Sequence, residues 1–390
     1  MRWSYQTTVL VSCTLAFFVT FFARLTISPV IPLIIEDFQT SNTLVGMALT
    51  GMWLAYGLSQ YPSGILADRF GERSIILIAV GGSVLASLFI ALAPMFAVFL
   101  IATISLGAVA GLHYSVATAL LSRTYDDVGT AVGLHSAGAP LAGFLAPLAA
   151  AWVGIRYGWQ PAVALGALVG LPVFALFYVS VRPTDPVRPD QAMRERLTVR
   201  PIVRFLSRPP IAFTLVIAIT STFVVQGLMS FLPTFLVVYR DYSAGFAGVL
   251  FSAYFVVRGT AQLAIGSLSD RHGRDSVLAG SMIAGGSGLV ILVTWSGVLA
   301  LSVGIVLIGI GAAFFPALDP RFLDELSEDE RNIGFGLVRT VYVVFGASGS
   351  VGLGFFADAF GWGASFIILA GLYFLAFCAL GVNYLLELGY

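Results

Sequence analysis

Three arginines lie inside stretches of sequence that are otherwise strongly apolar: Arg24, Arg258 and Arg339. A guanidinium is planar and always charged, and it binds carboxylate or phosphate through two parallel hydrogen bonds. One nearby carboxylate, Asp319, compensates them in part, so three positive charges less one negative charge leave an excess of +2. Because such an excess is tolerable where a cavity is wet or receives anions, an anionic substrate is the simplest interpretation.

The depth of each arginine bears on its role. Arg258 is near the middle of its apolar stretch, with eleven residues before Asp270, which puts it about 16 Å from the helix end at 1.5 Å per residue. Snorkelling does not easily explain that depth. Arg24 is nearer the end of its stretch, where substrate binding and snorkelling toward Glu36 and Asp37 are the alternatives.

Other polar side chains at membrane depth have two interpretations each. Arg339 either binds substrate or forms an ion pair with Asp319. His113, His135 and Asp319 are candidates for proton coupling, and a neutral, hydrogen-bonded histidine is the structural alternative. Three histidines and two distant cysteines offer no ligand spacing, so we expect no metal and no cofactor. Substrate contact and packing are the alternatives for three tyrosines: Tyr56, Tyr114 and Tyr254.

The composition places these residues in a membrane protein. Of the 390 residues, 58% are apolar and 10% are charged, whereas a soluble domain carries roughly 25% charged residues. Each membrane helix needs about 20 apolar residues, and lipid requires helices because it cannot satisfy exposed backbone groups. We therefore expect an all-α membrane protein with twelve spans, at 7–31, 42–66, 74–93, 96–121, 129–152, 159–180, 209–237, 245–268, 276–296, 298–320, 333–356 and 362–386.

A polar, proline-rich stretch with seven arginines divides the chain at 181–208. It predicts a six-helix bundle at 1–180, a cytoplasmic linker, and a second bundle at 209–390. With both termini in the cytoplasm, fifteen arginines lie inside, two outside and three within spans, as the positive-inside rule favours. The location is then the cell membrane, with multiple passes. Twenty basic and twenty acidic residues imply no nucleic-acid partner.

The two halves repeat one motif at an offset of 202 residues. QYPSGILADRFGER at 60–73 aligns with QLAIGSLSDRHGRD at 262–275, and YGW at 157–159 with FGW at 360–362. In each copy the first glycine allows close helix approach, the second permits a tight turn, and the aspartate lies where a carboxylate meets a positive helix end. These residues are Gly64, Asp68 and Gly71, then Gly266, Asp270 and Gly273. Two pseudo-symmetric bundles follow.

GILADRFGER closely resembles the signature G-x-x-x-D-R-x-G-x-R that follows the second helix of the major facilitator superfamily. The resemblance covers the whole chain, and it implies a secondary transporter, active as a monomer, that alternates access to a small-molecule site and uses a coupling ion in some branches. It also implies a cytoplasmic gate. The alternative is that these loops only follow the positive-inside rule, which explains their arginines but not their aspartates. The gate residues are Gly64, Asp68, Arg69, Gly71, Arg73, Gly266, Asp270, Arg271 and Gly273.

The substrate class rests on a second, looser likeness. Basic residues on helices eight and eleven resemble the organic-anion branches of the family, and Arg258 and Arg339 match by helix and depth. Two features depart from the family: Thr103 stands where helix four usually has an arginine, and the N-terminal half has no deep carboxylate for proton coupling. GLHSAGAPLAGF at 133–144 only partly resembles the antiporter signature of helix five.

The sequence is compatible with several functions. A transporter of a neutral solute, a drug-like efflux pump and a non-transporting sensor would share this fold. A membrane enzyme would need a nucleophile, a metal cluster or paired carboxylates at membrane depth, and the sequence has none. We therefore predict a transporter and no enzyme.

Overall fold

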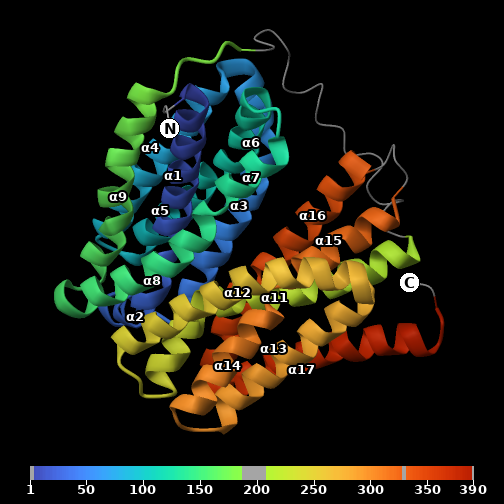
Figure 1. Cartoon of the computed structure of the whole chain (residues 1–390). Coiled ribbons are helices and arrows are strands. Elements are labelled where there is room, and N and C mark those ends of the chain that lie inside the picture. The colour runs from blue at the N-terminus through green and yellow to red at the C-terminus, as the bar shows by residue number, and fades with distance from the viewer. Residues whose placement is uncertain (1–3, 187–207, 327–330, 389–390) are drawn as a thin grey trace. The chain divides into compact units, whose positions relative to one another are not determined.

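The computed structural model describes residues 4–186, 208–326 and 331–388, with side chains in the last range from 334 onward. Every regular element in these residues is a helix (Figure 1). The predicted all-α membrane fold is confirmed. Most of the predicted linker at 181–208 lies outside the described residues.

The helices of the N-terminal half follow the predicted spans closely. The first span ends in a short 3-10 turn and a brief helix before the second begins. The elements are α1 (Tyr5–Leu25), η1 (Ser28–Val30), α2 (Ile31–Phe38), α3 (Asn42–Phe70), α4 (Glu72–Ala91), α5 (Phe96–Gly111), α6 (His113–Thr124), α7 (Val128–Ser136), α8 (Gly138–Tyr157) and α9 (Trp159–Ser180).

The helices of the C-terminal half repeat this pattern. They are α11 (Pro209–Val238), α12 (Ala244–His272), α13 (Arg274–Thr294), α14 (Val298–Gly311), α15 (Phe315–Asp324), α16 (Arg331–Ala347) and α17 (Gly349–Leu385).

Ten helical segments of the described chain are long and apolar enough to cross a membrane. The last of them, 334–385, has 52 residues, and the non-helical backbone of Gly361 at φ 79° divides it into two passes. Helix α3 has 29 residues and is not among the ten, because its polar residues lower its mean hydropathy. If α3 is counted as a span and the last segment as two spans, the described helices are compatible with the twelve predicted spans.

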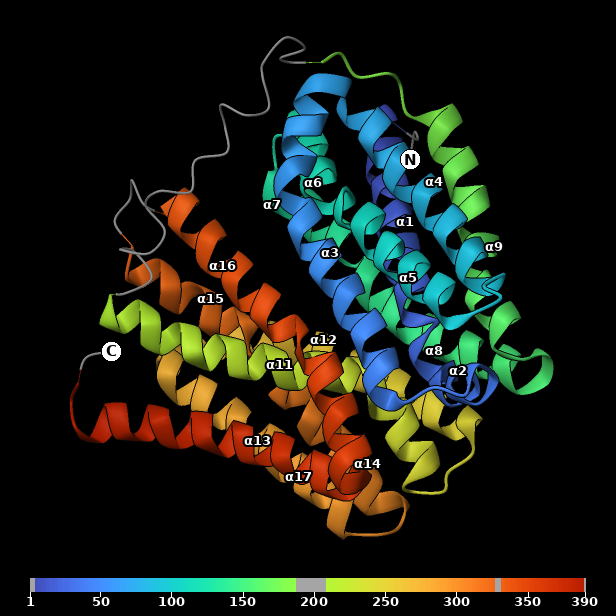
Figure 2. The ribbon, with the colours of Figure 1, turned by 180° about the vertical axis from the view of Figure 1, so that it is seen from behind.

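The described chain separates into two compact units. Among the described residues, unit 1 comprises 4–40, 47–186 and 236–252, and unit 2 comprises 41–46, 208–235, 253–326 and 331–388. In unit 1, α1 packs on α8 and α9, and α4 packs on α5 and α9 (Figure 2). In unit 2, α13 packs on α14 and α17. Each unit therefore has its own core.

Glycines at corresponding places of the repeat hold corresponding turns. Gly71 and Gly273 have φ of 82° and 84°, and Gly158 and Gly361 have φ of 89° and 79°. Side chains other than glycine rarely adopt this conformation, so the tight turns predicted at Gly71 and Gly273 are confirmed. The expected close approach at Gly64 is wrong for this structure, because a Cβ there would meet no described atom within 4 Å.

Four spans predicted as continuous helices are broken near their middle. The breaks fall at Leu112, Ala137, Ala313 and Ser348, and at each the backbone N–H donates to the carbonyl three residues earlier, at 3.0 to 3.2 Å. A tighter turn of this kind often marks a functional region of a helix. A glycine adjoins each break and packs against the backbone of a neighbouring helix; these are Gly111, Gly138, Gly311 and Gly349.

Candidate functional site

Arg24 lies in the last turn of α1 and is enclosed by aromatic rings of unit 1. Only 1% of its surface is exposed. Its Nε donates a hydrogen bond to the carbonyl of Thr20 at 3.0 Å. The Cζ atom lies 4.5 Å from the ring centroid of Phe21, 4.7 Å from that of Trp53 and 4.0 Å from that of Tyr56. The snorkelling alternative is wrong, because this side chain turns inward toward α3.

The two terminal nitrogens of Arg24 have no hydrogen-bond partner among the described residues. No carboxylate in that part of the chain forms an ion pair with it. Cation–π contacts contribute about 2 kcal/mol or more when desolvated, whereas burying an unpaired ion costs several kcal/mol. The guanidinium therefore retains donors and a charge that an anion would satisfy.

Arg258 on α12 is half-buried in unit 2. Its Nη1 contacts Sδ of Met229 at 3.4 Å, and its Cζ lies 6.0 Å from the ring centroid of Phe315. Sulfur is a weak acceptor, so this guanidinium also has unused hydrogen-bonding capacity. The buried Tyr254, one turn earlier, lies within electrostatic reach of it.

Tyr56 and Arg258 occupy the same position of the repeat, 202 residues apart, whereas Arg24 aligns with Gln226 at that offset. Unit 1 thus places arginine on its first span against tyrosine on its second. Unit 2 places methionine on its first span against arginine on its second. Each unit therefore supplies one guanidinium, from its first span in unit 1 and from its second span in unit 2.

Arg339 belongs to a different arrangement, beside the breaks in the tenth and eleventh spans. The Tyr342 hydroxyl donates a hydrogen bond to Oδ1 of Asp319 at 3.0 Å. Arg339 attracts the same carboxylate electrostatically. This geometry favours the ion-pair alternative for Arg339 over direct substrate binding. The uncompensated charges are then those of Arg24 and Arg258.

His113 and His135 meet beside the breaks in the fourth and fifth spans. Both are fully buried, and their ring centroids lie 5.4 Å apart. Phe17 of α1 covers both rings, with centroids at 5.7 and 5.0 Å. Tyr114 stacks on His135 at 5.8 Å, and its hydroxyl lies 3.5 Å from Oγ of Ser136. The four imidazole nitrogens have no hydrogen-bond partner of normal geometry among the described residues.

The signature loop of unit 1 also fastens neighbouring helices of that unit. Nε and Nη2 of Arg73 donate to the carbonyls of Val181 and Tyr178 at 2.7 and 2.6 Å, so Arg73 satisfies the C-terminal end of α9. Glu72 is buried and pairs with Arg123 at 2.7 Å. These contacts lie within one unit, and the gate role of the signature residues stays a prediction.

The corresponding loop of unit 2 has a similar ion pair. Asp275, in the first turn of α13, accepts from Nε of Arg321 on α15 at 2.6 Å. Arg274 beside it pairs with Asp324 at 2.6 Å. In both units, therefore, an acidic residue in the first turn after the signature glycine binds an arginine near the end of a broken span.

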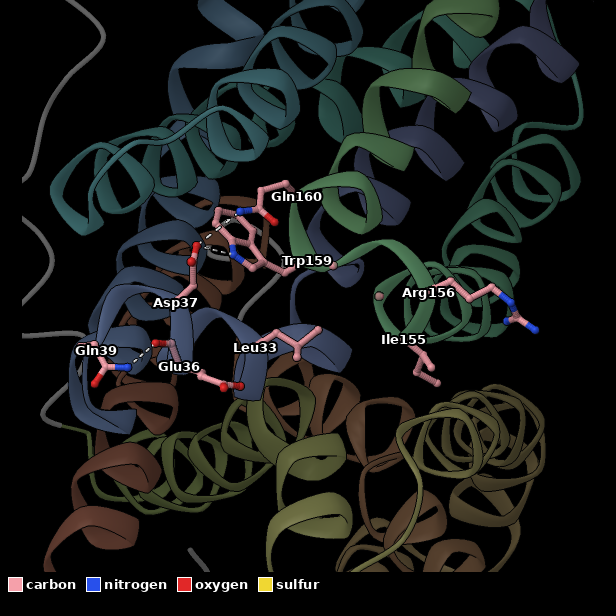
Figure 3. Close-up of a pocket in the computed structure, with 10 residues that line it drawn as sticks. Leu33, Glu36, Asp37, Gln39, Ile155, Arg156, Trp159 and Gln160 are labelled. Carbon is pink, nitrogen blue, oxygen red and sulfur yellow. Dashed lines mark hydrogen bonds between the residues drawn. The ribbon is translucent and has the colours of Figure 1, made fainter.

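A surface cavity of about 580 Å³ lies between α2 and the turn from α8 to α9. Oδ2 of Asp37 accepts hydrogen bonds from Nε1 of Trp159 at 2.9 Å and from Gln160 at 3.3 Å. The side chain of Arg156 points away from Glu36 and Asp37 (Figure 3). Two carboxylates make this cavity unsuited to an anion, so it is not the candidate substrate site.

Comparison with known proteins decides the family. The model of the Major Facilitator Superfamily matches residues 13–249 and 238–387. The chain belongs to the Major Facilitator Superfamily. It is accordingly a multi-pass membrane protein and a transporter of small solutes, in a family of transporters rather than enzymes.

Several members of the Major Facilitator Superfamily are similar to this chain. The hexuronate transporter of Bacillus subtilis (strain 168) is 22% identical over 376 residues, covering 92% of this chain and 89% of that protein. Multidrug resistance protein MdtG of Salmonella arizonae is 26% identical, covering 66% and 65%.

Solved structures of the superfamily share the fold. A bacterial homologue of the human lysosomal transporter Spinster, inward-facing and occupied, has a TM-score of 0.83 at 16% identity, covering 97% of each chain. The nucleoside transporter NupG has a TM-score of 0.78 at 15% identity, covering 98% of this chain and 99% of that chain.

Sequence reasoning missed the rings that complete the two buried sites. Phe21 precedes Arg24 by three residues, and Trp53 precedes Tyr56 by three, so each pair shares a helix face. Phe17 lies one further turn along the face of Phe21. The sequence therefore shows which rings share a helix face with Arg24 and Tyr56. It does not show that these faces of α1 and α3 pack against each other.

Proposed function

We propose that this protein is a secondary transporter of a small organic or inorganic anion, moved by alternating access. The observation that carries the proposal is Arg24: a fully buried guanidinium whose terminal nitrogens have no acceptor in the described chain. Arg258 supports it as a second, partly unsatisfied guanidinium, at the position of unit 2 that aligns with Tyr56. Tyr56 and Tyr114 are the proposed polar neighbours of the solute in unit 1, and Tyr254 has the same proposed role beside Arg258 in unit 2.

The relatives support an anion without deciding it. A hexuronate carries a carboxylate at neutral pH, which is the group that a guanidinium binds through two hydrogen bonds. Multidrug resistance proteins also match this chain, so a neutral or drug-like efflux substrate is the alternative. The two differ in charge, and the charge of Arg24 favours the anion.

The orientation and the gate belong to the same proposal. The excess of arginine in the loops on one side supports a cytoplasmic position for both termini. The repeated signature then lies on the cytoplasmic side, where Asp68, Arg69 and Arg73, with Asp270 and Arg271, are proposed to stabilise the closed gate. The transporter is proposed to act as a monomer.

The test compares thermal unfolding of purified wild type and Arg24→Gln with and without small anions. Hexuronates, oxalate, lactate, phosphate and sulfate form the panel, and the amide of a hexuronate is the uncharged comparison. At least one anion should raise the Tm of wild type. Arg24→Gln should lose about 1.5 to 3 kcal/mol of binding free energy, the contribution of a hydrogen bond to a charged group.

The matched control is Arg156→Gln, because Arg156 also lies over an aromatic ring, at 4.3 Å from Trp152, but is exposed. It should keep the full response to the anion. Stabilisation of Arg24→Gln equal to that of wild type would contradict the assignment. Stabilisation by the amide alone would favour the neutral-solute alternative, and binding without flux in vesicles would indicate a sensor.

A further inference from the structure

The exposed side of α8 ends in an arginine that the anion site does not use. Helix α8 packs on α1, and its buried residues are alanines, glycines and one proline. Exposed residues at spacings of four and seven lie on the opposite side of the helix: Leu141, Leu145, Trp152 and Arg156. In a membrane-spanning helix this exposed apolar side meets lipid, and Arg156 lies where it reaches the helix end.

Two aromatic rings accompany Arg156 on that surface. Its Cζ atom lies 4.3 Å from the ring centroid of Trp152, one helical turn earlier. The ring of Tyr157 meets that of Trp152 edge-on, with centroids 6.3 Å apart. Trp152 is 52% exposed and Tyr157 is 65% exposed. A guanidinium and two amphipathic rings are therefore gathered on the outside of unit 1, at a helix end.

The charge of Arg156 has no carboxylate to neutralise it. Among the described residues no ion pair includes Arg156, and its side chain points away from Glu36 and Asp37 (Figure 3). The end of the helix dipole attracts a cation there but does not use its N–H groups. A stacked ring covers only a face of the planar guanidinium, so the donors at its edge stay available.

Membrane topology does not account for this residue either. The positive-inside rule explains fifteen of the arginines, whereas Arg156 is one of two that the same orientation places on the other side. An arginine on the disfavoured side, stacked on an exposed tryptophan, calls for a negative partner outside the chain.

We propose that Arg156, Trp152 and Tyr157 form a binding site for the headgroup of an anionic phospholipid such as phosphatidylglycerol. The guanidinium binds phosphate oxygens through parallel N–H bonds, and the two rings lie at the level of the headgroup. An acyl chain then follows the exposed side of α8 toward Leu145. Eleven residues separate Leu145 from Arg156, about 16 Å of helix, which matches the roughly 15 Å of hydrocarbon in one leaflet.

The charge and the apolar surface together select this class of ligand. The surface offers one positive charge, so a headgroup with a net negative charge fits it better than a zwitterionic one, by about fivefold for a single arginine. A free phosphate ester would meet the same guanidinium but would leave the exposed leucines uncovered. The inference goes beyond the proposed anion function and does not depend on it, because Arg24 is buried and Arg156 is exposed.

Trp152 provides a local reporter for the experiment. Three of the six tryptophans are buried: Trp53, Trp159 and Trp362. In a reporter protein with Trp3→Phe and Trp295→Phe, Trp152 is then the exposed tryptophan of the described chain. The whole reporter protein is reconstituted in phosphatidylcholine bilayers, and its fluorescence is quenched with brominated phosphatidylglycerol or with brominated phosphatidylcholine. The ratio of the two quenching curves gives the relative binding constant of the lipids beside Trp152.

The reporter protein should prefer phosphatidylglycerol by about fivefold. Arg156→Gln should bring the ratio close to one, and Arg156→Lys should keep part of the preference, since it retains the charge without the planar fork. About 1 M NaCl should weaken the preference by screening. The matched control keeps Trp295 and replaces Trp3 and Trp152 by phenylalanine; Arg156→Gln should leave the quenching of Trp295 unchanged, because Trp295 belongs to unit 2.

The remaining outcomes overturn the site. Equal quenching by both lipids in the reporter protein, or a preference that survives Arg156→Gln, contradicts lipid binding at Arg156. Loss of the preference on addition of glycerol 3-phosphate at constant ionic strength would indicate a site for a free phosphate ester and would overturn the lipid assignment. None of these results depends on solute binding at Arg24, so the failure of either proposal leaves the other standing.

Discussion

The Cζ atom of Arg24 lies 4.0 Å from the centre of the Tyr56 ring, and the two side chains come from adjacent spans of unit 1. The contact places a full positive charge over a face that carries partial negative charge. It explains how a buried arginine persists without a carboxylate. It also leaves the outer nitrogens of the guanidinium unused.

Replacing Tyr56 by leucine should lower the free energy of unfolding by about 1 to 2 kcal/mol, because one desolvated cation–π contact is lost. Tyr56→Phe should lose much less, since the ring is kept. Denaturant unfolding in detergent measures both. The exposed Tyr384→Leu is the control and should change little; equal losses for the Leu and Phe variants of Tyr56 would contradict the ring contact.

Arg123→Gln should destabilise unit 1 by about 2 kcal/mol, less than a fully buried pair because half of the Arg123 side chain is exposed. The loss arises because Glu72 would remain buried without its partner. The double variant with Glu72→Gln should recover much of the stability. A double-mutant cycle of unfolding free energies measures the coupling, and strictly additive losses would exclude it.

Gly107→Ala should destabilise the protein by about 1 to 3 kcal/mol, the usual result of overpacking. The added Cβ would overlap the carbonyl oxygen of Met52 on α3. Gly133→Ala is the matched control, since a Cβ there meets no described atom within 4 Å. Thermal unfolding should lower the Tm for the first variant only; an unchanged Tm at position 107 would contradict this helix crossing.

Asp127 should make a stability contribution that depends on pH. Its carboxylate caps α7 by accepting from the N–H of Thr130 at 3.2 Å, and hydrogen bonds with the Thr130 side chain and with this N–H lower the pKa of Asp127. The contribution is therefore present above the ordinary aspartate pKa of about 3.9 and is lost as pH falls through the lower, folded-state value. Asp127→Ala should have a lower Tm than wild type at pH 7, and the difference should shrink toward pH 3. A constant difference would contradict the cap.

The sequence predicted the fold well because membrane spans depend on length and composition, which are local. The positive-φ turns at Gly71 and Gly273 were also predictable, since the motif requires them. The breaks at Leu112 and Ala137 were not. A single tighter turn beside a glycine has no distinct sequence pattern in a chain with 42 glycines, and its position depends on the neighbouring helix.

The candidate site was predictable only by residue type. The sequence identifies Arg24 as a candidate because a charge at membrane depth is costly. The direction of its side chain depends on the packing of α3 beside α1, which only the structure shows. Likewise, Asp319 and Arg339 lie 20 residues apart on different spans, and only the structure shows Tyr342 on the same carboxylate. Side-chain direction depends on helix rotation, which composition does not set.

The most direct test of the central claim is uptake of small anions by vesicles that contain purified wild type or Arg24→Gln protein. A panel of radiolabelled hexuronates, small carboxylates, phosphate and sulfate is offered together with uncharged amide analogues. We predict that wild type accumulates at least one anion, that its amide is not transported, and that Arg24→Gln vesicles lose the uptake while Arg156→Gln vesicles keep it. Uptake of an amide at the same rate, or full anion uptake by Arg24→Gln, would contradict an anion transporter built around Arg24.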